Sequence, residues 1–234
     1  MVGTEKRVRL GLAYGSLVVG CVWLTTTGNA LASVLIVFGV LLTLSEWMLG
    51  GNGFIALSSG AAGEDAEIDA ATVLKRRLGR DAAAVLRNLL VPNPMSSVGS
   101  TEADVVVVTD AGVFVFEVKS HRGVVVADPK ADGWPVSWRG KGSVIRNPVR
   151  QVSGQVRAIR AYLAGKGLNT PVHAAVYMPN AEVRKVGHLS VPVFTSRQFL
   201  APFVKAKDGE KVVGSGKLVA EALRQGAADA PGRD

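Results

Sequence analysis

The segment that most constrains the fold covers residues 102–123 and is predicted to form a β-hairpin. Two runs rich in valine, 105–109 and 113–118, flank an Asp-Ala-Gly turn in which glycine can adopt the positive φ that closes such loops. Each run is apolar enough to be buried on both faces of a sheet. We therefore expect the hairpin to lie inside a hydrophobic sheet.

Charged side chains interrupt this apolar pattern at one end of the hairpin. Asp104 opens the first strand, and Glu117 and Lys119 close the second, although burying charge on a strand is costly. Because strand side chains alternate, Glu117 and Lys119 project from one face while Val118 points to the other. An acid and a base side by side at the end of a hydrophobic sheet suit a metal ion and a water molecule.

The register of the hairpin decides whether the two acids can act together. One metal ion can contact both carboxylates only if Asp104 pairs with Glu117 or lies close to it diagonally. A slip of one residue would point the acids to opposite faces of the sheet. The turn at 110–112 is compatible with a two-residue loop and with a three-residue loop carrying a bulge, so the sequence leaves both registers open.

The N-terminal part of the chain is apolar, with no charged side chain from residue 10 to residue 45. That is longer than one bilayer crossing needs, so we expect two transmembrane helices, at about 10–25 and 30–48, joined by a polar turn. Lysine and arginine residues precede and follow the pair, which places both ends in the cytoplasm. A secretory signal peptide is the alternative, but its cleavage would leave a second apolar run, 34–44, at the new terminus.

The remainder of the chain predicts a mixed α/β sheet flanked by helices. A small-residue linker at 51–62 precedes a helix that starts at Glu64 and stops at Gly79. Further expected strands are 84–91, 124–127, 135–139, 172–178 and 191–194; further expected helices are 149–163, 196–203 and 217–224, followed by a disordered tail at 225–234. The helix at 149–163 follows Asn147-Pro148, a favourable N-cap and first helical residue. One cysteine excludes a disulfide framework and a cysteine-based zinc site.

Five short motifs occur together in this order and resemble one known family. They are Gly63-Glu64 at a helix start, Glu102-Ala-Asp104, Gly112-Val-Phe-Val-Phe-Glu117-Val-Lys119 followed by Gly123, Trp134, and Asn147-Pro148-Val-Arg-Gln151. The pattern resembles the nuclease-related (NERD) domain, which is similar to the PD-(D/E)XK nucleases. The resemblance covers residues 63–163 and implies a restriction-endonuclease-like core. The expected organisation is a membrane anchor at 1–50, a flexible linker at 51–62, the nuclease-like domain at 63–205, and a C-terminal helix and tail at 206–234.

The resemblance also implies roles for individual residues. The expected catalytic set is Glu64, Asp104, Glu117, Lys119 and Gln151, with Asp104, Glu117 and the Val118 carbonyl as metal ligands. Lys119 corresponds to the lysine that positions or activates the attacking water. Few hard oxygen ligands suit Mg²⁺ or Mn²⁺ better than zinc, and the three histidines, His121, His173 and His188, lack ligand spacing.

The basic residues of the chain concentrate around this site. Residues 119–160 contain nine lysines and arginines against two acids, a net charge of +7 within a chain of net +8. We expect Lys141, Arg146, Arg150 and Arg157 to bind the phosphates of a nucleic acid. The alternative is attraction to the anionic inner leaflet of a membrane. Trp134 and Trp138 fit core packing better than stacking on bases.

These observations predict a membrane-anchored, divalent-metal-dependent nuclease with a cytoplasmic domain that hydrolyses phosphodiester bonds in DNA, RNA being the second possible substrate. The alternative function is a catalytically silent nucleic-acid-binding or scaffolding module tethered to the membrane. The carboxylates, lysine and glutamine together favour the enzyme, because a module that only binds nucleic acid does not need a metal site.

Overall fold

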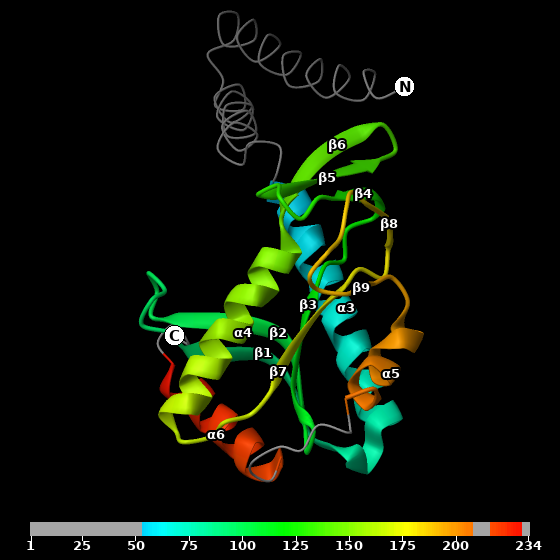
Figure 1. The fold of residues 1–234 in the computed structure, drawn as a ribbon. Helices are drawn as coiled ribbons and strands as arrows, with labels where there is room; N and C mark the ends of the chain where they lie inside the picture. The colour runs from blue at the N-terminus through cyan, green and yellow to red at the C-terminus, as the bar shows by residue number, and fades with distance from the viewer. Residues whose placement is uncertain (1–52, 208–215, 231–234) are drawn as a thin grey trace, which may run out of the picture. The chain divides into compact units, whose positions relative to one another are not determined.

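A computed structural model of the protein describes residues 53–207 and 216–230, and the elements are labelled as in Figure 1. In chain order they are α3 (Gly53–Leu78), η1 (Gly79–Asp81), β1 (Ala82–Pro92), β2 (Ser100–Thr109), β3 (Gly112–Val118), β4 (Gly123–Ala127), β5 (Gly133–Trp138), β6 (Lys141–Arg146), α4 (Pro148–Gly165), β7 (Val172–Tyr177), β8 (Ala181–Lys185), β9 (Val193–Phe194), η2 (Arg197–Phe199), α5 (Leu200–Lys205) and α6 (Gly216–Asp229).

The larger sheet has the strand order β1-β2-β3-β7-β9 within the described residues. The β1–β2 and β2–β3 pairs are antiparallel, whereas the β3–β7 and β7–β9 pairs are parallel. Strand β3 is buried at every position, as the apolar run at 113–118 predicts. The mixed α/β sheet expected from the sequence is therefore confirmed.

A second, smaller sheet with the order β6-β5-β4-β8 follows the first hairpin. Its two outer strands, β6 and β8, have no counterpart among the strands expected from the sequence. Most of their side chains are exposed, and their composition is polar, so they lack the apolar alternation that reveals a strand. Trp134 on β5 is fully buried, which confirms that it packs in the core, whereas Trp138 is 43% exposed, so the prediction of core packing is wrong for that residue.

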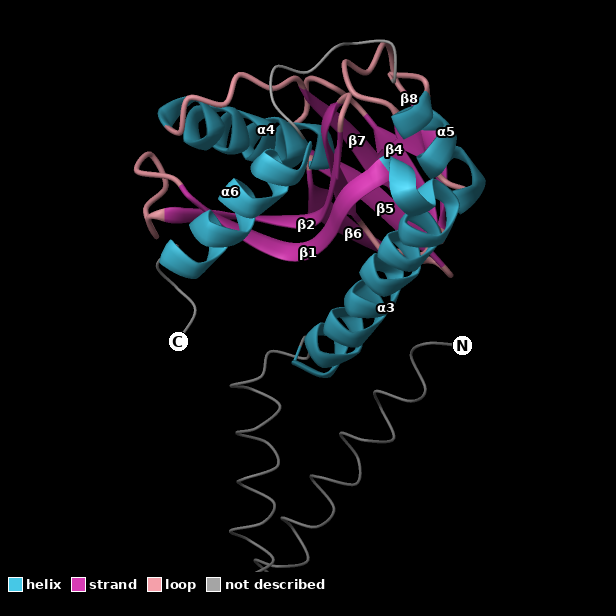
Figure 2. Ribbon diagram, turned by 90° about the horizontal axis from the view of Figure 1, so that it is seen from below, coloured by secondary structure: helices cyan, strands magenta, loops and turns pink. Residues whose placement is uncertain are grey.

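Helices cover both faces of the larger sheet, with α4 and α6 on one face and α3 and α5 on the other (Figures 1 and 2). On the first face Val106 and Val115 pack with Val152 and Ile159 of α4 and with Leu223 of α6. On the second face the alternate strand residues join apolar side chains of α3 and α5 in a separate hydrophobic cluster. The hairpin thus contributes to two cores, which explains why its strands are apolar on both faces.

Helix α4 begins where the Asn-Pro pair predicts. The Oδ1 atom of Asn147 accepts hydrogen bonds from the backbone N–H groups of Val149 (3.0 Å) and Arg150 (3.3 Å), and Pro148 occupies the first turn. This N-cap satisfies donors that have no partner within the helix itself.

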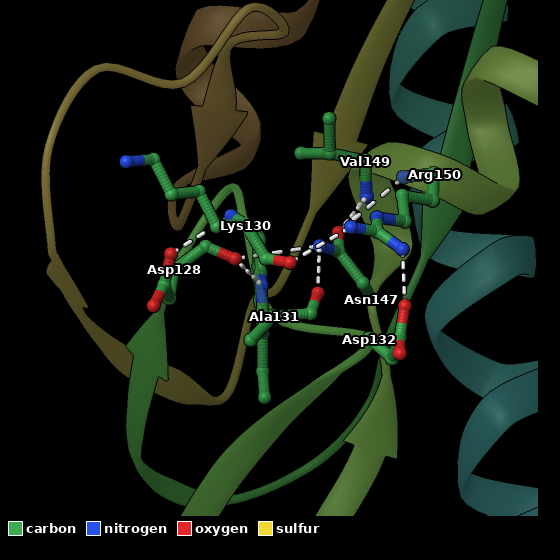
Figure 3. Close-up of polar contacts among 8 residues, drawn as sticks. Asp128, Lys130, Ala131, Asp132, Asn147, Val149 and Arg150 are labelled. Carbon is green, nitrogen blue, oxygen red and sulfur yellow. Dashed lines mark hydrogen bonds and ion pairs between the residues drawn. The ribbon is translucent and has the colours of Figure 1, made fainter.

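The same asparagine attaches α4 to the loop between β4 and β5 (Figure 3). Its Nδ2 atom donates to the carbonyl oxygens of Ala131 (2.8 Å) and Asp128 (3.3 Å), and the Arg150 guanidinium pairs with the Asp132 carboxylate. Because Asn147 is fully buried, these contacts fix the start of α4 relative to the smaller sheet.

Two helices extend beyond their predicted bounds. Helix α3 begins at Gly53, so residues 53–62, expected as a flexible linker, are helical, and Glu64 lies within the helix instead of at its start. Helix α6 continues to Asp229, so residues 225–229 of the expected disordered tail are helical as well. Glycine and alanine are abundant in both segments, and their small side chains give a weak apolar periodicity.

The predicted transmembrane helices at 10–25 and 30–48 lie outside the described residues. Among the helices that the structure does describe, none is long and apolar enough to cross a bilayer.

Candidate active site

The hairpin register brings the two predicted acids opposite each other. Thr109 pairs with Gly112 and Val105 with Phe116, so the loop contains two residues, and the same register places Asp104 across from Glu117. Gly112 has φ +143°, and a Cβ atom there would lie 2.8 Å from the Pro171 carbonyl oxygen. Glycine is therefore required both for the turn and for the close approach of the chain that leads into β7.

Glu117 is a buried carboxylate with both oxygens engaged. It is 2% exposed, the Lys119 Nζ atom lies 2.6 Å from Oε1, and the Gln155 Nε2 atom donates to Oε2 at 2.5 Å. Because a carboxylate accepts at up to four lone-pair positions, these two contacts leave it able to bind a cation as well. Glu117 therefore points to the α4 face of the sheet.

Asp104 lies beside this group in an unusual electrostatic environment. Burial, and next the negative charge of Glu117, raise its pKa to about 7 from the ordinary value of 3.8. The Val118 N–H group, which donates to Oδ2 at 2.7 Å, and the Lys119 ammonium lower the same pKa only in part. Two acids held together at a buried position strongly favour binding of a proton or a metal ion.

The acid that α3 presents to this pair is Glu67, one turn after the predicted Glu64. Glu64 is exposed, and its carboxylate lies 3.7 Å from the Arg87 guanidinium. Burial raises the pKa of Glu67, the Arg87 charge lowers it, and Glu102, Glu64 and Glu117 raise it further. The charge of Glu67 also raises the pKa of Asp104. Sequence spacing could have suggested Glu67, since it shares a helix face with Glu64.

The glutamine that contacts the acids is Gln155 and not the predicted Gln151. Both lie on α4, one turn apart, and Gln155 donates its amide hydrogen to Glu117. The Gln151 Oε1 atom is buried without a hydrogen-bond partner among the described residues. Helical spacing of four residues places both on one face, so the motif alone does not decide which one reaches the acid.

His121 is a neighbour of the site that the sequence did not indicate. Burial, and next the positive charge of Lys119, lower the pKa of its imidazole. Its Nδ1 atom is buried and has no hydrogen-bond partner within the described part of the chain. The histidine therefore adds no positive charge beside Lys119 at neutral pH.

A cavity of about 620 Å³ lies between the β1–β2 connection and α4, and Gln155, which contacts Glu117, is among its lining residues. Three of the four predicted phosphate-binding residues, Arg146, Arg150 and Arg157, line it, together with Gln151 and Gln155. The fourth, Lys141, is exposed at the start of β6 and is not among the lining residues. Gln155 thus connects the cavity to Glu117.

The site fits a magnesium-type ion better than an ion enclosed by many side chains. Within residues 53–207 and 216–230, no group of three or more histidine, cysteine, aspartate and glutamate side chains is arranged to hold a metal. Two carboxylates and one main-chain carbonyl are nevertheless a reasonable ligand set for Mg²⁺, which keeps several water molecules. Burial, and next the charge of Glu117, raise the pKa of Asp104, and a bound cation would offset both effects.

The fold and the site define an α/β domain whose central hairpin ends in a buried acid, Glu117, next to the partly buried Asp104 and Lys119. A family model described as the nuclease-related domain (NERD) matches residues 60–179, about half of the chain, and the chain belongs to this family. The family description points to a nuclease-like phosphodiesterase function. Neither the curated proteins nor the solved structures contain a significant match to the chain.

Proposed function

We propose that the domain is a divalent-metal-dependent nuclease that hydrolyses phosphodiester bonds in DNA. The observation that carries the proposal is Glu117, which is buried with Lys119 and Gln155 on its two oxygens and lies opposite Asp104. A salt bridge that served only stability would gain nothing from a second buried acid, because two carboxylates repel each other. A strongly raised pKa such as that of Asp104, at a carboxyl group next to a second acid, is typical of functional sites.

The residues have separate tasks in the proposed reaction. Asp104, Glu117 and the Val118 carbonyl would bind Mg²⁺ or Mn²⁺, which lowers the pKa of a bound water molecule and neutralises phosphate charge. Gln155 holds the Glu117 carboxylate in one orientation through its amide hydrogen. The Lys119 ammonium, next to Glu117, is positioned to stabilise the negative charge that develops on the phosphate oxygens as water attacks phosphorus.

We infer a restriction-endonuclease-like core from the mixed sheet with α3 and α4 on its two faces. Glu67 extends the acidic group on the α3 side, in place of Glu64. Arg146, Arg150 and Arg157 supply positive charge for the substrate backbone next to the acids.

The experiment that tests this proposal is cleavage of labelled single-stranded DNA, duplex DNA and RNA by the purified full chain. We expect cleavage in Mg²⁺ or Mn²⁺ and no cleavage in EDTA. Lys119→Met should lower the cleavage rate by at least about a hundredfold, because removal of one group that stabilises the transition-state charge has an effect of that size. Substrate binding without metal-dependent cleavage would instead support the silent binding module.

We also propose that residues 10–48 anchor the chain in the cell membrane as two helices, with the domain in the cytoplasm. The support is the uncharged stretch at 10–45 with basic residues on both sides. An alkaline phosphatase that is active only outside the cytoplasm, fused after Asp234, should be inactive in cells. An active fusion would contradict this topology and favour the signal-peptide interpretation.

A further inference from the structure

The cavity beside the acids has the dimensions of a site for a single small ligand. Its volume of about 620 Å³ lies within the range of roughly 300–1,000 Å³ that is usual for such sites. It is bounded by the β1–β2 connection on one side and by α4 on the other, and it shares Gln155 with the Glu117 site. A ligand in the cavity would therefore be adjacent to the proposed reaction centre.

Two of the residues that line the cavity, Gln151 and Gln155, have a buried acceptor atom without a partner in the described part of the chain. Gln155 donates its Nε2 hydrogen to Glu117, and because a carboxylate only accepts, the remaining amide atom of Gln155 is the acceptor Oε1. This Oε1 and that of Gln151 are both without a hydrogen-bond partner among the described residues. Buried acceptor atoms nearly always accept a hydrogen bond, so these two oxygens favour a ligand that carries N–H or O–H donors.

Two cations at the cavity are available for phosphate groups. Arg146 and Arg157 form no ion pair in the part of the chain that the structure describes, whereas the Arg150 guanidinium is already bound to Asp132 and to the Lys130 carbonyl. Arginine forks match phosphate oxygens well. The lining thus combines phosphate-binding donors with acceptors for N–H groups.

The rim of the cavity carries exposed apolar side chains on a firmly held loop. Met95 is 96% exposed and Val98 is 68% exposed, and Met95 also lines the cavity. The loop is cross-linked by hydrogen bonds from the Asn93 N–H to the Gly99 carbonyl (2.8 Å) and from the Asn93 side chain to Thr101 Oγ1 (2.8 Å). Apolar side chains of this kind can pack against an unstacked base or separate a base step.

We propose that the cavity binds one unpaired nucleotide next to the phosphate that is cleaved, so that single strands or frayed ends are the preferred substrate. The proposal rests on the proposed nuclease function and specifies its substrate class. In a duplex the N–H groups of a base are paired and its faces are stacked. An unpaired base can instead donate its N–H groups to the glutamines and pack one face against Met95. A lipid acyl chain would offer no hydrogen to the two buried acceptors.

Binding measured without metal tests this inference separately from catalysis. Fluorescence anisotropy in EDTA would compare the full chain binding a short labelled single strand and a duplex of the same sequence. The key variant is Gly154→Leu, which fills the cavity from α4; a Cβ atom there meets only the Arg157 Nη2 atom, at an ordinary 3.8 Å. Gly165→Leu is the matched control, on the same helix, outside the cavity and with nothing within 4 Å of the added Cβ.

We expect the wild type to bind the single strand more tightly than the duplex. Gly154→Leu should bind the single strand on the order of tenfold more weakly than the wild type, with its duplex affinity unchanged. Gly165→Leu should bind both substrates like the wild type. Met95→Ala should weaken single-strand binding too and provides the same test if Gly154→Leu does not fold. Equal affinities of the wild type for the single strand and the duplex would overturn the inference, as would unchanged single-strand binding by both Gly154→Leu and Met95→Ala.

The inference would also be overturned if these two variants lost binding to anionic lipid vesicles but kept binding to the oligonucleotide. Single-strand binding without cleavage in Mg²⁺ would reject the nuclease function but leave the nucleotide site standing.

Discussion

Among single residues, Asp104 links the stability of the fold to pH. Its pKa is raised in the fold, so the folded state holds this proton more tightly than the unfolded state does. Protonation of Asp104 therefore contributes to the free energy of unfolding of the metal-free protein. This contribution is fully present below about pH 4 and is lost as pH rises to about 7.

Asp104→Asn tests this linkage directly. Asparagine keeps an oxygen that accepts from the Val118 N–H but cannot ionise. The free energy of unfolding of the variant, relative to that of the wild type, should therefore rise by about 2 kcal/mol from pH 5 to pH 8. Thermal unfolding in EDTA at the two pH values measures the difference, and Asp128→Asn, remote from the acid pair, is the control. A pH dependence equal to that of the wild type would contradict the raised pKa of Asp104.

Of the five residues predicted as catalytic, the structure places three together and two apart from them. Asp104, Glu117 and Lys119 lie on one hairpin, where strand alternation and register restrict each side chain to one direction. Gln151 and Glu64 lie on helices, where a residue one turn away shares the same face, and contact depends on how the helix packs on the sheet. In the structure Gln155 and Glu67 occupy those places.

At the scale of the element, the start of α4 connects the acidic site to the smaller sheet. Asn147→Ala removes the N-cap and the hydrogen bonds to the Ala131 and Asp128 carbonyls, so we expect a loss of about 2–3 kcal/mol in the free energy of unfolding.

A matched control for this variant is Ser153→Ala, which removes only a bond from the Ser153 hydroxyl to the Val149 carbonyl within α4. It should change the free energy of unfolding by less than about 1 kcal/mol. Chemical denaturation of both variants measures the contrast, and equal effects would show that the asparagine is not the attachment point proposed here.

One element-scale feature could not be predicted from the sequence. Asn88 lies across from Asp104 in the β1–β2 register and adopts φ +49°. Ala103 and Val106 belong to the same hydrophobic cluster although they are three residues apart, so the side chains of β2 do not alternate regularly near Asp104. A valine-rich sequence predicts a regular strand, and such a distortion depends on tertiary packing that propensities do not contain.

At the scale of the whole molecule, the basic segment divides into residues beside the site and residues away from it. Arg146→Ala and Arg157→Ala should each flatten the dependence of nucleic-acid affinity on salt by about one unit in the logarithmic slope. Lys141→Ala, outside the cavity, should change this slope by less than half as much. A larger effect of Lys141 than of the two arginines would place the binding surface on the smaller sheet instead.

The measurement that tests the central claim most directly is single-turnover cleavage of labelled single-stranded DNA in Mg²⁺ by the wild type and by Glu117→Gln. Glutamine has nearly the same shape but lacks the charge that would bind the metal, so we expect cleavage to fall by at least about a hundredfold while the fold, measured by circular dichroism, is retained. Glu182→Gln, on exposed β8, should cleave like the wild type. Equal cleavage by Glu117→Gln and the wild type would contradict the assignment of the active site to this hairpin.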